Sequence, residues 1–116
     1  IMAYNLTLDS ISEAILERAA AGVAVQGVFD EGQAQNQGSD VSRLAQAGLD
    51  VWLDGNPGLM HHKVIVVDGE LVITGSYNFS RSAEERNDEN VLFLFSQELA
   101  AQYLLEFERL LAEAGG

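Results

Sequence analysis

The residues best suited to chemistry gather at one point of the chain. Both histidines and the only lysine occupy three consecutive positions, His61, His62 and Lys63. Lysine and arginine together number 6 against 18 acidic residues, and the formal net charge is -12. A neutral imidazole can attack phosphorus, and an ammonium supplies a point charge for the phosphate oxygens. The cluster therefore indicates a site that binds and attacks a phosphoryl group.

The two histidines are expected to have different roles. Residues 61–67 have the composition of a strand, and side chains in a strand alternate between its faces. His61 and Lys63 then share one face, and His62 points to the other, where we expect no catalytic role. A histidine alone in a strand is more often a structural or surface residue, and that is the alternative for His61.

Further polar residues follow this strand. Gly75 would let the backbone come close to a ligand. Ser76 and Asn78 would share a face if the extended geometry continues, and both can donate hydrogen bonds to phosphate oxygens. The alternative for Gly75 and Ser76 is a plain strand end.

A carboxylate could fix the tautomer of the proposed nucleophile. Glu89 or Asp68 could accept a proton from the far ring nitrogen of His61 and make the imidazole more basic. Turn geometry is the leading explanation for Gly69, which follows Asp68.

The spacing of apolar residues, together with capping and glycine residues, predicts the helices and strands that position these residues. The run Ser10–Glu13 is a capping-box pattern that predicts a helix start, and Gly22 closes that helix. Residues 30–38 and 80–87 are expected to be loops. The predicted strands cover residues 1–6, 23–29, 51–53, 61–67, 71–74 and 89–95, and further helices cover residues 40–47 and 97–114. Together they predict an α/β fold, a mixed sheet sandwiched by helices, as a single domain over residues 1–116.

Composition excludes several classes of protein. The chain is 47% hydrophobic, which is enough for a core and too much for a disordered protein. It has no apolar run of about 18 residues and no signal-peptide pattern, so we expect no transmembrane segment. With no cysteine, it has no disulfides and no thiolate metal sites. We expect a soluble protein, and the composition does not distinguish a cytoplasmic from an exported one.

Taken together, the site residues spell His-x-Lys, four residues, Asp, six residues and Gly-Ser-x-Asn. This pattern resembles the HKD motif of the phospholipase D superfamily. A chance match of six fixed positions is on the order of one in a million at average residue usage. The likeness extends to Tyr4 with Thr7 after the first strand, to Asn87-x-Glu89-Asn90, and to Tyr103 with Phe107 in the last helix.

The resemblance implies roles for matching positions. His61 would be the nucleophile or the general acid, and Glu89 would orient it. Phosphate would be bound by Lys63, Ser76 and Asn78, while Asp68 and Gly75 would be structural. The resemblance implies no metal and no cofactor.

The family needs two such motifs, because one histidine attacks and the other protonates the leaving group. This chain has one motif. The resemblance therefore implies a second HKD half, from a homodimer partner or from the rest of a longer chain. Family units also have a strand and a helix before the position of Ile1, so we expect the chain to be incomplete at its N-terminus.

Three functions compete. The first is a metal-independent phosphodiesterase that acts through a phosphohistidine, with nucleic acid as the leading substrate in an endonuclease-like reaction. The acidic composition and the lack of a basic groove count against it, because nucleic-acid affinity depends largely on phosphate neutralisation. The second is a phospholipase D-type hydrolase or transphosphatidylase half-site acting on phospholipid, although no basic amphipathic helix is present. The third is a non-catalytic assembly module, which the intact motif makes less attractive.

Overall fold

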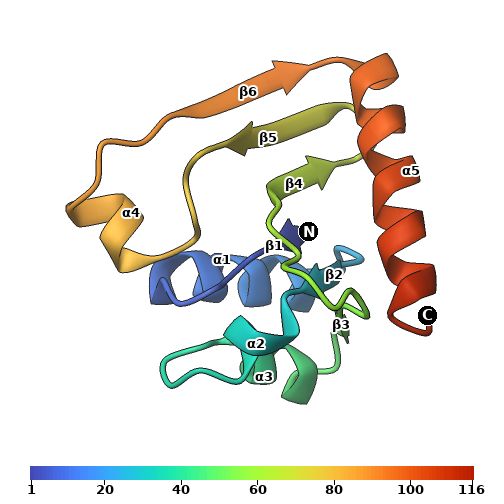
Figure 1. Ribbon diagram of the computed structural model, residues 1–116. Coiled ribbons are helices and arrows are strands. Elements are labelled where there is room, and N and C mark those ends of the chain that lie inside the picture. Colours follow the sequence, from blue (N-terminus) through green and yellow to red (C-terminus); the bar gives the residue numbers. More distant parts are fainter.

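One mixed sheet of six strands, covered by helices, organises the molecule (Figure 1). The structure is a computed structural model that describes residues 1–116. Its strands are β1 (Met2–Ala3), β2 (Gln26–Phe29), β3 (Asp50–Leu53), β4 (Lys63–Val67), β5 (Leu71–Gly75) and β6 (Val91–Phe95). They lie in the order β3-β2-β1-β4-β5-β6, with β1, β2 and β3 parallel and the pairs β1–β4, β4–β5 and β5–β6 antiparallel. The predicted α/β fold is confirmed.

Five helices complete the fold: α1 (Asp9–Ala20), α2 (Glu31–Ala34), α3 (Val41–Gln46), α4 (Arg81–Glu85) and α5 (Gln97–Glu113). Helix α5 packs against β2, β4 and β5. Side chains of α1, α2 and α3 pack in a second cluster on the opposite face. No helix is both long and apolar enough to cross a bilayer.

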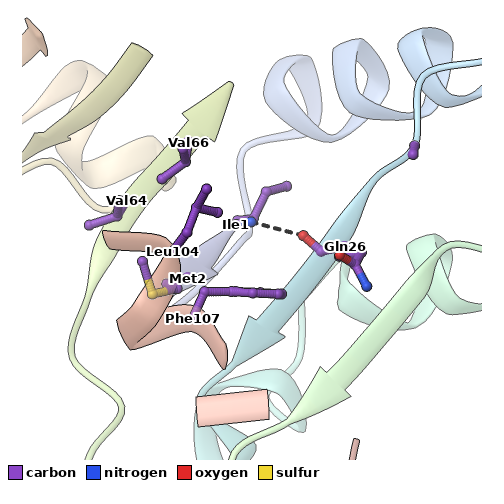
Figure 2. Close-up of a pocket in the computed structure, with 8 residues that line it drawn as sticks. Ile1, Met2, Gln26, Val64, Val66, Leu104 and Phe107 are labelled. Carbon is purple, nitrogen blue, oxygen red and sulfur yellow. Dashed lines mark hydrogen bonds between the residues drawn. The ribbon is translucent and has the colours of Figure 1, made fainter. Parts of the chain in front are cut away.

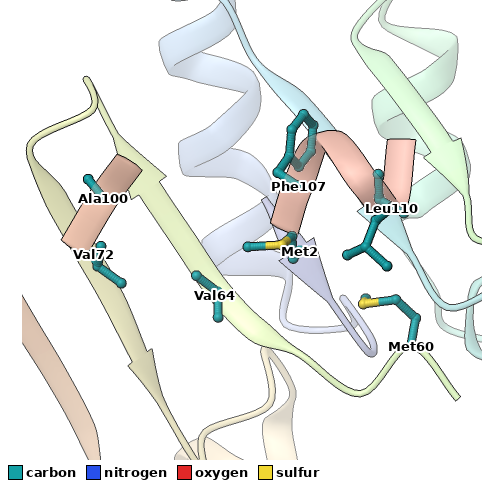
Figure 3. Close-up of a cluster of buried hydrophobic side chains, with 8 residues drawn as sticks. Met2, Met60, Val64, Val72, Ala100, Phe107 and Leu110 are labelled. Atoms are coloured by element: carbon teal, nitrogen blue, oxygen red, sulfur yellow. The ribbon is translucent and has the colours of Figure 1, made fainter. Parts of the chain in front are cut away.

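Strand alternation divides the core into two clusters. Met2 and Val28 point toward α5, while their neighbours Ala3 and Phe29 point toward the other face. The α5 cluster also contains Met60, Val64, Val72, Ala100, Phe107 and Leu110 (Figure 3). The sheet therefore has a buried layer on each side, and consecutive residues of a strand lie in different environments.

The hairpin that follows the site is formed as predicted. Asp68 and Gly69 both have positive φ, 56° and 64°. The amide of Glu70 donates a hydrogen bond to the Val67 carbonyl, and positive φ at both central residues is typical of a type I′ turn. Three residues, 68–70, thus separate Val67 from Leu71, its partner in the ladder.

The start of the chain differs from the prediction. Strand β1 ends at Ala3, and Leu6 instead forms an isolated bridge with Phe79. The capping-box prediction was wrong, because α1 begins at Asp9 and has no side-chain cap. Ser12, expected within that box, is buried and donates a 2.7 Å hydrogen bond to Asp40.

Two of the predicted loops contain one-turn helices. Asp30 accepts a hydrogen bond from the amide of Gln33 and starts α2. Ser80 accepts one from the amide of Ala83 and starts α4. Each helix depends on a single capping side chain, which satisfies an amide that would otherwise lack a partner.

The two edges of the sheet differ in polarity. At one edge, Asp50 of β3 accepts hydrogen bonds from Gln26 and Trp52. At the other edge, β6 exposes 53% of Leu92, 60% of Phe93 and 80% of Phe95. The β6 edge is therefore an apolar surface with one side of its backbone unpaired.

Candidate active site

The site residues lie where the strand order reverses. The chain runs from β1 outward to β2 and β3, and then returns to the other side of β1 as β4. In open α/β sheets, ligands bind beyond the carboxyl ends of the parallel strands at such a switch point. Tyr4 follows the carboxyl end of β1, and His61 lies two residues before the start of the neighbouring strand β4.

His61 and Lys63 lie together on one face, as predicted. His61 is exposed, and the Lys63 ammonium donates a 2.8 Å hydrogen bond to the His61 carbonyl oxygen. The Tyr4 ring lies against both residues: its centroid is 4.8 Å from that of the His61 ring and 5.3 Å from Lys63 Nζ. An accessible imidazole and an ammonium therefore share one surface.

The charge of Lys63 is available to a ligand. Four of the five arginines, Arg18, Arg43, Arg81 and Arg109, form ion pairs with carboxylates. Lys63 forms no such pair. Partial burial lowers the pKa of Lys63, and the nearby negative charge of Glu89 opposes that shift. A phosphate would supply the anionic partner that this ammonium lacks.

His62 points to the opposite face, as predicted. Its Nε2 lies 3.0 Å from Oε1 of Glu106 on α5. Arg109 also binds that carboxylate, and both partners contribute to lowering the pKa of Glu106 to about 2. Only 29% of the Glu106 side chain is exposed, because it joins α5 to the segment that precedes β4. His62 thus anchors that segment to the helix.

Ser76 and Glu89 form a second polar group. The Ser76 hydroxyl donates a 2.5 Å hydrogen bond to Glu89, and Asn87 donates to the other oxygen of the same carboxylate. These two bonds, with the charge of Lys63, hold the pKa of Glu89 below its usual value. No hydrogen bond joins Glu89 to His61 here, so its orienting role stays a prediction.

Asp68 cannot orient His61, so that alternative was wrong. It occupies the turn at the far end of β4, five residues beyond Lys63, which is about 17 Å along an extended strand. Its place in the turn agrees with the structural role that the resemblance implies.

Gly75 is needed for close packing between strands. A Cβ at this position would clash with the carbonyl oxygen of Asn90. The same carbonyl accepts a hydrogen bond from the amide of Ser76, and the Asn90 amide donates back to the Ser76 hydroxyl. Gly75 therefore lets the chain after β5 pair closely with the start of β6.

The side-chain oxygen of Asn78 lacks a partner within the chain. This Oδ1 atom is buried and accepts no hydrogen bond, and the same holds for Asn5 Oδ1. Leu6 and Phe79 pair in parallel one position further along each segment, so these two asparagines are near neighbours. A buried amide without partners is a candidate for contact with a ligand.

Two buried carboxylates that sequence reasoning left without a role shape the approach to His61. Asp30 accepts a 3.0 Å hydrogen bond from the amide of Met60, the residue before His61. Asp54 accepts hydrogen bonds from the amides of Glu31 and Asn56. The available signal was an acidic residue directly after each predicted strand. These carboxylates fix the loops at the carboxyl edge of the sheet.

A small hollow lies away from this chemistry. It measures about 140 Å³ and is lined mainly by apolar residues, including Val64, Val66 and Phe107 (Figure 2). The terminal amine of Ile1 donates a 2.8 Å hydrogen bond to the Gln26 carbonyl beside it. The hollow is on the α5 side, toward the amino ends of β1 and β2, and contributes nothing to the His61 surface.

Comparisons with known proteins agree with this arrangement. Residues 1–111 match the family described as "Cardiolipin synthase, PLD-like domain". The chain is 39% identical over 110 residues to the mitochondrial cardiolipin hydrolase of Chlamydomonas reinhardtii, covering 95% of this chain and 49% of that protein. It is also 39% identical over 104 residues to phospholipase D of Rickettsia conorii, covering 90% of this chain and 52% of that protein. The chain thus spans about half the length of these curated relatives.

Solved structures share the fold. Nuc from Salmonella typhimurium, a phospholipase D family member, superimposes with a TM-score of 0.92 at 32% identity, covering 97% of this chain and 76% of that chain. NucT from Helicobacter pylori gives a TM-score of 0.89 at 27% identity, covering 96% of this chain and 76% of that chain. The sheet and the helices therefore correspond to a known architecture.

Proposed function

The chain belongs to the phospholipase D superfamily, and from this membership we propose that it supplies one half of a metal-independent phosphodiesterase site. The observation that carries the proposal is the pairing of an exposed His61 with the free ammonium of Lys63 on one face. Ser76 and Asn78 follow at the end of β5 and complete the set of phosphate-binding groups. Glu89 lies close enough to Lys63 to affect its charge.

The reaction proceeds in two displacements. A neutral ring nitrogen of His61 forms a P–N bond while the P–O bond to the leaving group breaks. A second histidine gives its proton to the departing oxygen. Water, deprotonated by that same histidine, then attacks phosphorus and breaks the P–N bond. Lys63 stabilises the charge that builds on the phosphate oxygens in both steps.

The second histidine has to come from outside the residues described here, because His62 points toward α5. A second copy of the chain, related by a twofold axis, would bring two His61 rings together in an isologous interface. A longer chain with a second motif would do the same. Dilution distinguishes the two: specific activity falls below a threshold concentration for a dimer and stays constant for a single chain.

A trapping experiment tests the chemistry. The protein is mixed with a 32P-labelled phosphodiester and quenched, and the adduct should map to His61. It should form in the presence of a chelator and be absent in His61→Ala. Turnover with no adduct on His61, or turnover lost on chelation, would refute this mechanism. A protein with neither adduct nor turnover when the second half of the site is also present would instead be the assembly module.

Phospholipid is the better supported substrate class. Relatives of 39% identity are named mitochondrial cardiolipin hydrolase and phospholipase D. The net charge of -12 also disfavours a long polyanion, and most arginines are already paired. A phospholipid contains only one or two phosphodiesters, so the site has to bind much less negative charge than it would with a nucleic acid.

Nucleic acid is the second candidate, favoured by the close structural match to Nuc and NucT. The two substrates are compared by presenting cardiolipin or phosphatidylcholine vesicles and single-stranded or plasmid DNA to the same preparation. Release of lipid head groups without DNA cleavage favours phospholipid, and the reverse favours nucleic acid. Both activities should disappear together in His61→Ala.

A further inference from the structure

Tyr4 is fixed beside the catalytic segment by its backbone. In the ladder between β1 and β4, Ala3 lies opposite Lys63. The next amide, that of Tyr4, donates a 2.8 Å hydrogen bond to the His62 carbonyl. The position of the Tyr4 ring is therefore tied to the same strand pair that places His61 and Lys63.

One aromatic ring contacts both reactive side chains. The Tyr4 and His61 rings meet edge to face, with centroids 4.8 Å apart and planes inclined at 75°. This is the arrangement that aromatic pairs prefer. Lys63 Nζ lies 5.3 Å from the centroid of the Tyr4 ring, within the roughly 6 Å over which a cation is attracted to a ring face. The Tyr4 hydroxyl makes no hydrogen bond within the chain, so the ring itself makes these contacts.

The ring suits a lysine that must bind phosphate. A carboxylate in direct contact would neutralise the ammonium and compete with the phosphate oxygens. A ring quadrupole attracts the cation without carrying a net charge. The charged or titratable groups that face Lys63 are His61, Glu89 and Tyr4. Burial opposes the charged form of Lys63, and the ring and Glu89 both favour it.

We propose that Tyr4 is a positioning residue of the site, whose ring keeps the Lys63 ammonium charged and in place while restricting rotation of the His61 imidazole. The meaning of this role for catalysis rests on the proposed phosphodiesterase function. The contacts themselves are tested without any substrate.

The first test is an NMR titration of Lys63 in the protein labelled with 13Cε-lysine. Lys63 is the only lysine of this chain, and loss of its signal in Lys63→Arg confirms the assignment. Tyr4→Leu should lower the Lys63 pKa by roughly 0.5, the size expected from a cation–π contact at a partly exposed site. Tyr4→Phe, which keeps the ring and removes the hydroxyl, should leave it unchanged.

The histidines provide an internal control. Ring signals of His61 should shift in Tyr4→Leu, and those of His62, which pairs with Glu106 on the other face, should not. Tyr103→Leu is the matched control, because Tyr103 is also half-buried but packs in the α5 cluster. It should lower thermal stability without moving the Lys63 pKa. If Tyr4→Leu unfolds the protein, fluorinated phenylalanines at position 4 remove ring electron density at nearly constant size, and the Lys63 pKa should fall stepwise with fluorination.

Enzymatic activity supplies the second readout. In Tyr4→Leu kcat should fall more than KM rises, because the ammonium and the imidazole are less well positioned, whereas Tyr4→Phe should resemble the parent. Equal Lys63 pKa values in the Leu and Phe variants, or no response to fluorination, would overturn the role of Tyr4 even in an active enzyme. A normal Lys63 response in a protein that cleaves no phosphodiester even when the second half of the site is present would instead refute the proposed function alone.

Discussion

His61 and His62 are adjacent in the chain but lie in two different environments. His61 is exposed on the face that carries Lys63, against the ring of Tyr4, and its side chain forms no ion pair. His62 lies on the opposite face and contacts Glu106, which Arg109 also binds. The two histidines are one residue apart, yet the side chain of His61 is free to react and that of His62 contacts α5. Pairing between strands thus assigns the two histidines their roles without any difference in residue type.

The strongest test of this contrast is to remove each histidine in turn. His61→Ala should abolish turnover because no other group on its face can form the P–N bond. His62→Ala should keep substantial activity, since it removes only the contact with α5. The measurement is kcat/KM on whichever phosphodiester the parent cleaves, with the helix content of both variants verified by circular dichroism. Equal losses in the two variants would show that the assignment of faces is wrong.

The second largest effect is expected from the lysine on the His61 face. Lys63→Ala should lower kcat by about 10²–10³-fold, the range found when one positioned donor to a developing oxyanion is removed. Steady-state kinetics should show the loss mainly in kcat. Lys63→Arg is the control that keeps the charge with different geometry, and it should recover part of the rate. Full activity in Lys63→Ala would show that the ammonium is not used.

Glu89→Gln should have a smaller effect, on the titration of Lys63. Lys63 must be protonated to act, burial lowers its pKa, and the Glu89 charge raises it. Removing that charge should lower the Lys63 pKa further, which NMR titration of the 13Cε-lysine-labelled protein measures. Activity at neutral pH should fall by less than about tenfold, because water screens interactions between exposed charges.

The same variant decides whether Glu89 contacts His61 during the reaction. A loss of about 10²-fold or more at neutral pH would resemble removal of an essential general acid–base partner. Glu89 would then leave Ser76 and orient His61 once substrate is bound. Asn87→Ala is a suitable comparison, because it removes only the second hydrogen bond to the Glu89 carboxylate.

The smallest effect is expected on the His62 face, in stability rather than catalysis. The pKa of Glu106 is about 2 in the folded protein and about 4.3 for an unperturbed glutamate. The stabilisation from this carboxylate is therefore present above about pH 4.3 and is lost as the pH falls toward 2. Glu106→Gln should lower the free energy of unfolding by about 1 kcal/mol or less at pH 7.

Denaturant unfolding at several pH values measures that difference. The parent and Glu106→Gln should converge as the pH falls through 2, because the carboxyl group then becomes protonated in the folded state as well as in the unfolded state. Glu113→Gln is the matched control, because Glu113 also pairs with Arg109 but does not contact His62. A stability difference that persists unchanged at pH 2 would mean that packing, rather than charge, links α5 to His62.

Features set by local periodicity could be predicted from the sequence. The alternation of residues 61–63 gave the correct faces, and Asp68 with Gly69 gave the hairpin. Helix α5 was predicted over nearly its full length because its apolar residues recur at helical spacing.

Features set by contacts between distant segments could not be predicted. The partner of Glu89 is Ser76, 13 residues away, and the partner of His62 is 44 residues away on α5. Helices α2 and α4 each depend on one capping contact, which a polar composition does not distinguish from a loop. Sequence resemblance marked Tyr4, but only the pairing of β1 with β4 showed that its ring reaches both site residues.

The polarity of the two sheet edges has a practical consequence for handling this protein segment. The backbone along the outer side of β6 offers unpaired donors and acceptors, flanked by the exposed rings of Phe93 and Phe95. Such an edge can template further strands, so concentrated solutions of this segment should form oligomers or precipitate through β-pairing. Replacing Phe95 with lysine would place a charge on this edge, disfavour pairing with further strands and improve solubility. The position is remote from the catalytic residues.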